Sequence, residues 1–460
     1  MLKPLSPFFS VLLAAVLLAT AASAGEPLLV PEKLDLQTCI RIAIEKSPEL
    51  GEAQADLAFT GSKLAEAKAY RYPQISIMSL LGPAPGARKE DISPKIVTDS
   101  QFKFRDLTWF TSADLMITQP LWTFGKISES MKAATHGMEV DKAKKLQKGN
   151  EVALEVKKYY YGLLLARELQ NVIAELQEYL TQGKEKVHQL IENESASGDP
   201  MDLYKIDAYA GEVNKYMEEA LKGERLARAA LKARLGMPEN AAIELATDRL
   251  EIPDETIPVL TDSLDKARQQ RPEFKQLSEG MAARTALVEA AKAYYYPDVF
   301  LAGMVSWAYA DNRDRIDNPY ISDTFKHAYG GAVLGLKWQI DFGITGAKVS
   351  GEQAQLDRLA STKSFADNYI PLQVQKAWLE LQEARKNITI TLKAYQSAKK
   401  WGAAALANFD FGIGNPRDVF EAVGIYGKMK AAHYQAIFDY HMAKANLEYA
   451  SGENPFSHKN

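Results

Sequence analysis

The stretch AKAYRYP at residues 67–73 reappears as AKAYYYP at residues 291–297. Two more landmarks recur downstream in the same order: Phe-Gly at 124–125 and 342–343, then Gly-Asp-Pro at 198–200 and Gly-Asn-Pro at 414–416. Ordered self-similarity at a long spacing is the signature of an internal repeat. The sequence therefore predicts one architecture made twice.

Two copies of this unit account for nearly all of the chain after a short leader. The expected boundaries are residues 25–240 for the first copy, 241–452 for the second and 453–460 for a tail. In the leader, Lys3 precedes an apolar run that ends before the small residues Ala22-Ser23-Ala24. This pattern is typical of a secretory signal peptide. We expect residues 1–24 to be removed and the mature protein to be exported.

The composition excludes several classes of protein. The 460 residues are 47% hydrophobic and 25% charged, which is ordinary for a folded chain. A net charge of -4 leaves no basic surface for nucleic acid. A single cysteine, Cys39, excludes a disulfide framework. No stretch after the leader is long and apolar enough for a transmembrane helix, whereas the half-apolar strands of a membrane β-barrel remain compatible with these numbers.

Each copy is expected to form a helix, a β-hairpin and two long helices. Apolar residues alternate with other residues in the hairpin segments, at about residues 73–122 and 297–341. A membrane barrel needs at least about eight strands, so the four expected here cannot close one alone. The sequence therefore predicts that other copies of the chain complete the sheet.

Tryptophans lie near the ends of the expected strands: Trp109, Trp122, Trp307 and Trp338. Aromatic girdles at the two membrane interfaces have this pattern. The alternative is a soluble sheet with aromatic core residues, but four strands make only a small one.

The helical part is unusually long. No proline occurs between Pro120 and Pro200, and apolar residues recur at spacings of three and four, as in a coiled coil. A helix of about 65 residues would span roughly 100 Å. Each long helix is expected to turn at a glycine-rich tip before a second helix returns. The tip residues are Gly198 and Asp199 in the first copy, with Gly412, Gly414 and Asn415 in the second.

The sequence contains no recognisable motif for catalysis or metal binding. The histidines form no HxH or HExxH spacing, and no phosphate-binding loop or GxSxG elbow occurs. We expect no catalytic residue, no cofactor and no metal site. The protein is not expected to be an enzyme.

The sequence resembles the TolC family of outer-membrane efflux proteins. The resemblance lies in the order of its features: the leader, the tandem repeat, an aromatic residue and proline before each hairpin, Phe-Gly after each hairpin, and the glycine tips. The resemblance extends from about Leu34 to Gly452. It implies a mainly helical homotrimer in the outer membrane of a Gram-negative bacterium. Each chain would give four strands to a twelve-stranded membrane β-barrel, continued through the periplasm by an α-barrel of long helices.

The same resemblance implies a function and partners. The trimer would be the exit duct of a tripartite efflux pump or a type I secretion system. It would contact outer-membrane lipid, a periplasmic adaptor (membrane fusion) protein, and an inner-membrane pump or ABC exporter. An exported coiled-coil adhesin or structural stalk, without conduction, is the alternative from another class.

The resemblance also points to a gate at the second tip. The family's Asp-Val-x-Asp-Ala sequence is matched by Asp418-Val419-Phe420-Glu421-Ala422. Carboxylates three residues apart lie on one helix face, and a threefold axis would turn Asp418 and Glu421 into two cation-favouring rings. Alternatively, both carboxylates only complement the helix dipole. The first copy has Asp202 and Lys205 at the matching spacing, so Asp202 is a further candidate gate residue and the two copies differ in charge there.

This sequence departs from the family where the closed state is held. Relatives carry a tyrosine before the second tip and an arginine within it. Here the corresponding residues are Phe409 and Gly414, with Arg417 nearby. The contact that closes the tip is therefore expected to be built differently.

Overall fold

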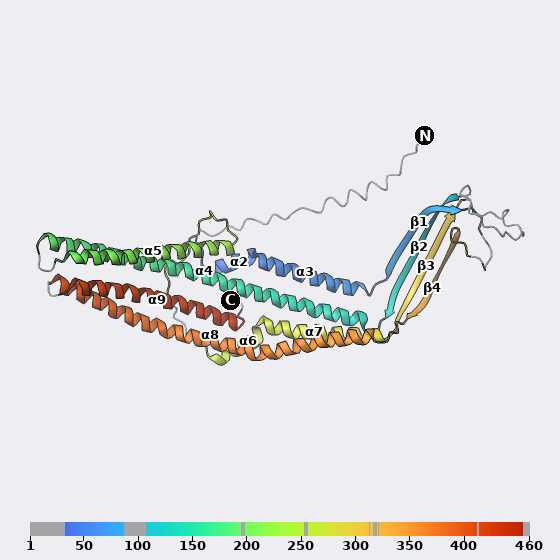
Figure 1. Cartoon of the computed structure of the whole chain (residues 1–460). Coiled ribbons are helices and arrows are strands. Elements are labelled where there is room, and N and C mark those ends of the chain that lie inside the picture. Colours follow the sequence, from blue (N-terminus) through green and yellow to red (C-terminus); the bar gives the residue numbers. More distant parts are fainter. Residues whose placement is uncertain are drawn as a thin grey trace, which may run out of the picture.

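The computed structural model describes residues 33–86, 107–194, 198–252, 256–311, 313–315, 320, 322–411 and 414–453. The predicted signal peptide, Gly412 and most of the predicted tail lie outside these described residues. Figure 1 shows an elongated molecule with a small sheet at one end and long helices running away from it.

Within the described residues, each copy contributes four α-helices in the same order. The first copy has α2 (Leu36–Lys46), α3 (Pro48–Ala69), α4 (Lys126–Glu192) and α5 (Pro200–Arg234). The second has α6 (Leu260–Gln270), α7 (Pro272–Lys292), α8 (Ile344–Asp410) and α9 (Pro416–Ala450), with a 3₁₀ turn at Ala293–Tyr295. Helices α4 and α8 each have 67 residues, and α5 and α9 each have 35. The predicted tandem repeat is confirmed, whereas its outer boundaries at residues 25 and 452 remain predictions.

The four strands form one antiparallel sheet in the order β1-β2-β3-β4. They are β1 (Gln74–Pro85), β2 (Leu107–Trp122), β3 (Asp298–Ala310) and β4 (His327–Lys337). Both predicted hairpins are therefore present, and β2 pairs with β3 to join the two copies. Their register shifts between Pro120 and Trp122. Among the described residues, no strand pairs with the outer edge of β1 or β4.

The register sorts the strand residues onto two faces, because directly paired residues point to the same side. One face, called the apolar face below, is exposed and carries apolar side chains that include Ile75, Ile77, Val305, Leu334 and Leu336. The other, called the mixed face, carries every Asp, His and Lys residue of the strands: Asp114, Asp298, His327 and Lys337. One side of the sheet is thus suited to lipid and the other to water.

Glycine connects the sheet to the long helices. The residues before α4 and α8 are Gly125 and Gly343, with φ of 108° and 135°. A side chain is strained at such angles, whereas glycine adopts them readily. This explains why Phe-Gly is one of the repeated landmarks.

Helix α4 lies at the centre of the helical body. It packs against α3 and α5 of its own copy and against α7 and α9 of the other, while α8 packs against α7 and α9. The main core lies near the middle of the body and contains Val156 and Leu163 of α4, Leu381 of α8 and Tyr440 of α9. Within the part of the chain that the structure describes, no helix combines the length and apolar character needed to cross a membrane.

Candidate functional site at the helical tips

Both copies turn at the end of the molecule farthest from the sheet (Figure 1). A Cβ atom on Gly198 would lie 2.8 Å from the Leu190 carbonyl oxygen, and one on Gly414 would lie 2.8 Å from the Phe409 amide nitrogen. Backbone atoms at this distance leave no room for a side chain. Gly198 and Gly414 are therefore required by the closeness of the turn to the end of the long helix.

The residue after each tip glycine caps the returning helix. Asp199 Oδ1 accepts a hydrogen bond from the Met201 amide at 2.9 Å, and Asn415 Oδ1 accepts one from the Arg417 amide at 2.9 Å. Proline follows each cap, at the position where a missing N–H costs nothing. Asp199 and Asn415 thus have the same structural role in the two copies.

The two predicted gate carboxylates share one exposed face of α9. Asp418 and Glu421 are both exposed, whereas Phe420 and Ala422 between and beside them are buried. No ion pair among the described residues involves Asp418 or Glu421. Both carboxylates are therefore accessible on one face of α9.

Asp202, the predicted counterpart in the first copy, is in a different environment. It is only 5% exposed, and its Oδ1 accepts a hydrogen bond from Lys205 Nζ at 2.7 Å. Its carboxylate is thus neutralised within its own helix, and no described contact joins it to Asp418 or Glu421.

The remaining predicted residues flank the second tip. Phe409 is half-buried and lines a cavity of about 430 Å³ with Leu180, Val187 and Phe420. Arg417 is exposed at the start of α9. Phe409 therefore faces a cavity shared with apolar residues of α4 and α9, where a tyrosine could have offered a hydroxyl group.

A polar cluster that sequence reasoning did not find connects α4 with α9. Glu175 of α4 accepts hydrogen bonds from Tyr426 Oη at 2.8 Å and from Lys430 Nζ, and Tyr179 Oη lies 3.3 Å from the same carboxylate. Beside this cluster, the Leu176 side chain fills the space where a Cβ of Gly427 would be. The first and second copies are therefore in close contact here.

The cluster changes the ionisation of its members. Burial alone would raise the pKa of Glu175, but the hydrogen bonds from Lys430 and Tyr426 outweigh it and lower the pKa below its ordinary value. Burial and the hydrogen bond to Glu175 raise the pKa of Tyr426. Glu175 thus stays a carboxylate held by two donors from the other copy. The only sequence signal for this cluster is the i,i+4 spacing of Tyr426 and Lys430, which puts both on one helix face. Their partner Glu175 is far away in the sequence.

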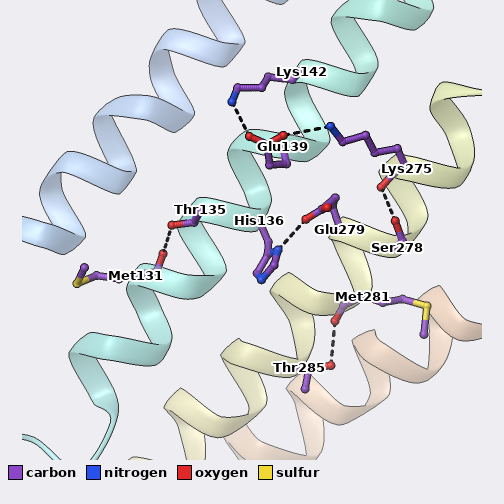
Figure 2. Close-up of polar contacts among 10 residues, drawn as sticks. All are labelled: Met131, Thr135, His136, Glu139, Lys142, Lys275, Ser278, Glu279, Met281 and Thr285. Carbon is purple, nitrogen blue, oxygen red and sulfur yellow. Dashed lines mark hydrogen bonds and ion pairs between the residues drawn. The ribbon is translucent and has the colours of Figure 1, made fainter. Parts of the chain in front are cut away.

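A second polar junction joins the copies nearer the sheet. Figure 2 shows His136 and Glu139 of α4 facing Glu279 and Lys275 of α7. His136 Nδ1 lies 2.7 Å from Glu279 Oε2, and Lys275 Nζ lies 3.2 Å from Glu139 Oε2. The contacts between the copies are therefore distributed along α4 and are not confined to its tip.

The predicted aromatic girdle residues lie at two levels of the sheet. Trp122 pairs with Val299 at the helical end of β3, and Trp338 Nε1 donates to the Tyr295 carbonyl at 3.1 Å near the same end. Trp109 and Trp307 lie toward the opposite end. All four side chains are exposed. No group of three or more His, Cys, Asp or Glu side chains within the described residues could hold a metal ion.

The fold and the tips together define a class of protein by its architecture: a four-stranded sheet that continues into two copies of a long helical hairpin. Residues 263–453 match the family described as outer membrane efflux protein. The structure is similar to that of the outer-membrane channel OprN, with a TM-score of 0.76, 16% identity, and coverage of 91% of this chain and 89% of that one.

Two other solved structures show the same likeness. The outer membrane protein VceC from Vibrio cholerae has a TM-score of 0.74 and 16% identity, with 91% of this chain and 96% of that chain covered. The open state of the MtrE outer membrane channel from Neisseria gonorrhoeae has a TM-score of 0.73 and 16% identity, with 91% and 88% covered. No curated protein gives a sequence match. These likenesses establish the fold, and the predicted fold class is confirmed.

Proposed function

We propose that the protein is a homotrimeric exit duct of the outer membrane, serving a tripartite efflux pump or a type I secretion system. The observation that carries this proposal is the four-stranded sheet with two unpaired edges and one exposed apolar face. An edge strand in lipid leaves backbone groups unsatisfied, so a spanning sheet must close on itself. Three copies would give twelve strands and no edge.

The level of the tryptophans fits a membrane span. From Val299, which pairs with Trp122, to Trp307 is eight residue steps along β3. At about 3.3 Å per residue this is roughly 26 Å along the strand, or about 20 Å along the membrane normal at a tilt of about 40°, which lies within the apolar band of about 25 Å in outer-membrane barrels. The apolar face between the two levels would contact lipid, and the mixed face would line the lumen.

An unpartnered stripe on α8 supports the trimer. The stripe consists of apolar residues that recur at helical spacings and are 45% to 64% exposed in the single chain: Phe365, Tyr369, Leu372, Leu379 and Ile390. A solvated apolar stripe of this length is costly, and burial against a neighbouring subunit would remove the cost. Helix α8 would then stand at the subunit boundary of an α-barrel.

The second tip is the proposed gate. The exposed carboxylates Asp418 and Glu421 would form two stacked rings around a threefold axis, attracting cations at the narrowest point. The cluster of Glu175, Tyr426 and Lys430 would hold α9 against α4 in the closed state, in place of contacts that Phe409 and Gly414 cannot make. Opening would require the helix pair α8 and α9 to move together, as one body, away from α4.

The tips are also the proposed docking surface for a periplasmic adaptor protein, which would connect the duct to an inner-membrane pump or ABC exporter. The adaptor would contact the end of the helical body farthest from the sheet, at Gly198, Asp199, Gly414 and Asn415. The alternative, an adhesin or stalk, offers no use for an exposed apolar sheet between two levels of tryptophan.

The proposal is tested by expressing the full chain and fractionating the membranes. We expect heat-resistant trimers in the outer-membrane fraction and discrete conductance steps after reconstitution into planar bilayers. A soluble protein, or a membrane protein that does not conduct, would contradict the proposed function.

A further inference from the structure

The far end of the sheet carries a network that the proposed duct does not explain. Asp323, in the segment before β4, forms a two-pronged ion pair with Arg313, at 3.0 Å from Nη2 and 3.1 Å from Nε. The Asp323 side chain is only 3% exposed. Arg313 Nη1 also donates to the Pro85 carbonyl at the end of β1, at 2.6 Å. Through Arg313, the segment 322–327 is thus connected to β1, at the opposite edge of the sheet from β4.

Aromatic contacts hold the same segment down. The Phe325 ring packs edge-on against Phe110 of β2, with centroids 5.0 Å apart, and the Arg313 guanidinium lies over the Phe325 ring at 5.1 Å from its centroid. Phe110 is on the mixed face, as is Ser112, which is 6% exposed. Segment 322–327 therefore covers the end of the mixed face that is farthest from the helices.

A chain of hydrogen bonds runs from this segment across three strands. His327 Nδ1 lies 2.8 Å from the Asp323 carbonyl oxygen, and His327 Nε2 lies 2.7 Å from Ser306 Oγ. Ser306 Oγ lies 2.5 Å from Asp114 Oδ1. The chain thus reads Asp323 carbonyl, His327, Ser306, Asp114, and it contains three hydrogen bonds.

The three hydrogen bonds need three protons. A neutral imidazole supplies one, which must be on Nδ1 because a carbonyl oxygen only accepts. The Ser306 hydroxyl supplies one more, which can go to Asp114 or to Nε2 but not to both. With an ionised Asp114 and a neutral His327, one hydrogen bond is therefore missing. The complete chain requires one additional proton.

Imidazole is the more basic partner, with an ordinary pKa of about 6.5 against about 3.9 for an aspartic carboxyl group. The additional proton therefore belongs on His327. We propose that His327 is held as an imidazolium and acts as a proton-dependent latch that fastens segment 322–327 to the sheet. Loss of the proton breaks one link of the chain and loosens the segment.

The surrounding charges agree with this assignment. The Asp323 carboxylate is occupied by Arg313, which leaves Asp114 as the counter-ion of the imidazolium. Lys326 donates to the Arg313 carbonyl oxygen and lies 4.9 Å from the Tyr309 ring, and Tyr329 stacks on His327 at 5.0 Å. The network therefore holds two carboxylates, Asp114 and Asp323, against Arg313, Lys326 and the imidazolium.

The test is hydrogen exchange of the full-length protein, measured by mass spectrometry on peptides that cover 322–327. Protection, corrected for the intrinsic rate, is compared at about pH 6 and about pH 8.5, on either side of the ordinary imidazole range. We expect wild-type protection to fall by about tenfold at the higher pH, the factor of one hydrogen bond to a charged group.

Asp114→Asn is the decisive variant. Its amide group can donate to Ser306 Oγ, which frees the serine proton for His327 Nε2, so the chain is complete without the additional proton. We expect this variant to stay protected at both pH values. Ser306→Ala should lose protection at both, and the control Asp311→Asn, in the same connection but outside the chain, should follow the wild type.

A second readout is the ¹⁵N spectrum of the histidine rings, with His327 assigned by its loss in His327→Gln. We expect both ring nitrogens to carry a proton at about pH 6 in the wild type and only Nδ1 in Asp114→Asn. A wild-type protection that is equal at both pH values would overturn the latch. So would an Asp114→Asn variant that retains the wild-type pH dependence.

Discussion

The two tips are built on the same turn but differ one step beyond it. Both have a glycine that no side chain could replace, a capping Asp199 or Asn415, and then a proline. In the first copy, the next carboxylate, Asp202, is buried and paired with Lys205. In the second, Asp418 is exposed. The repeat thus keeps the turn for the fold, while the first turn of each returning helix has diverged.

The shared part of the comparison can be tested at the glycines. We expect Gly198→Ala and Gly414→Ala to lower the free energy of unfolding equally, by about 3 kcal/mol each, because the backbone must move to admit a Cβ. The measurement is unfolding by urea titration. Gly211→Ala is the control, because a Cβ there meets no atom within 4 Å. A large loss at only one tip would show that the turns are not equivalent.

The different part of the comparison can be tested at Asp202. We expect Asp202→Ala to lower the free energy of unfolding by about 2 kcal/mol, since it removes a buried hydrogen bond to a charged group. Asp418→Ala should leave the same quantity nearly unchanged. Asp207→Ala, which removes an exposed ion pair to Lys184, is the matched control on α5. Equal losses for Asp202→Ala and Asp418→Ala would remove the distinction between the tips.

Loss of the helix cap should destabilise the two copies by the same amount. Asp199→Ala and Asn415→Ala each remove one hydrogen bond to a helix amide, so each should cost about 1 kcal/mol. Urea titration of the two variants gives this difference directly. If only one variant loses stability, the two caps do not have the same role.

The cluster at Glu175 should give the smallest effect, because partial exposure screens it. Its pKa is lower in the folded protein than its ordinary value of 4.5. Its contribution is therefore present above about pH 4.5 and is lost as the pH falls through the lower folded value. We expect leak conductance to rise in that acidic range. Glu175→Gln should leak at neutral pH, whereas the exposed control Glu178→Gln should not.

Much of the fold follows from local pattern. The long helices could be predicted from spacing, the hairpins from alternation, and the tips from glycine and proline, because these signals lie within a few residues of each other. The pairing of β2 with β3 and the chain from Asp114 to His327 could not be predicted, since their members meet only after the two copies join. The burial of Asp202 was missed for the same reason. Its spacing to Lys205 is the same whether the helix face is covered or exposed.

We propose that only the second tip carries a cation-attracting gate. Single-channel recording in planar bilayers, with a divalent cation added on the side of the helical tips, tests this proposal. We predict that the double variant Asp418→Ala, Glu421→Ala weakens block by about tenfold or more, the scale on which charged constrictions concentrate counter-ions. The divalent cation should block the Asp202→Asn channel as strongly as it blocks the wild type. Unchanged block in the double variant, or an equal loss of block in Asp202→Asn, would contradict the proposed gate.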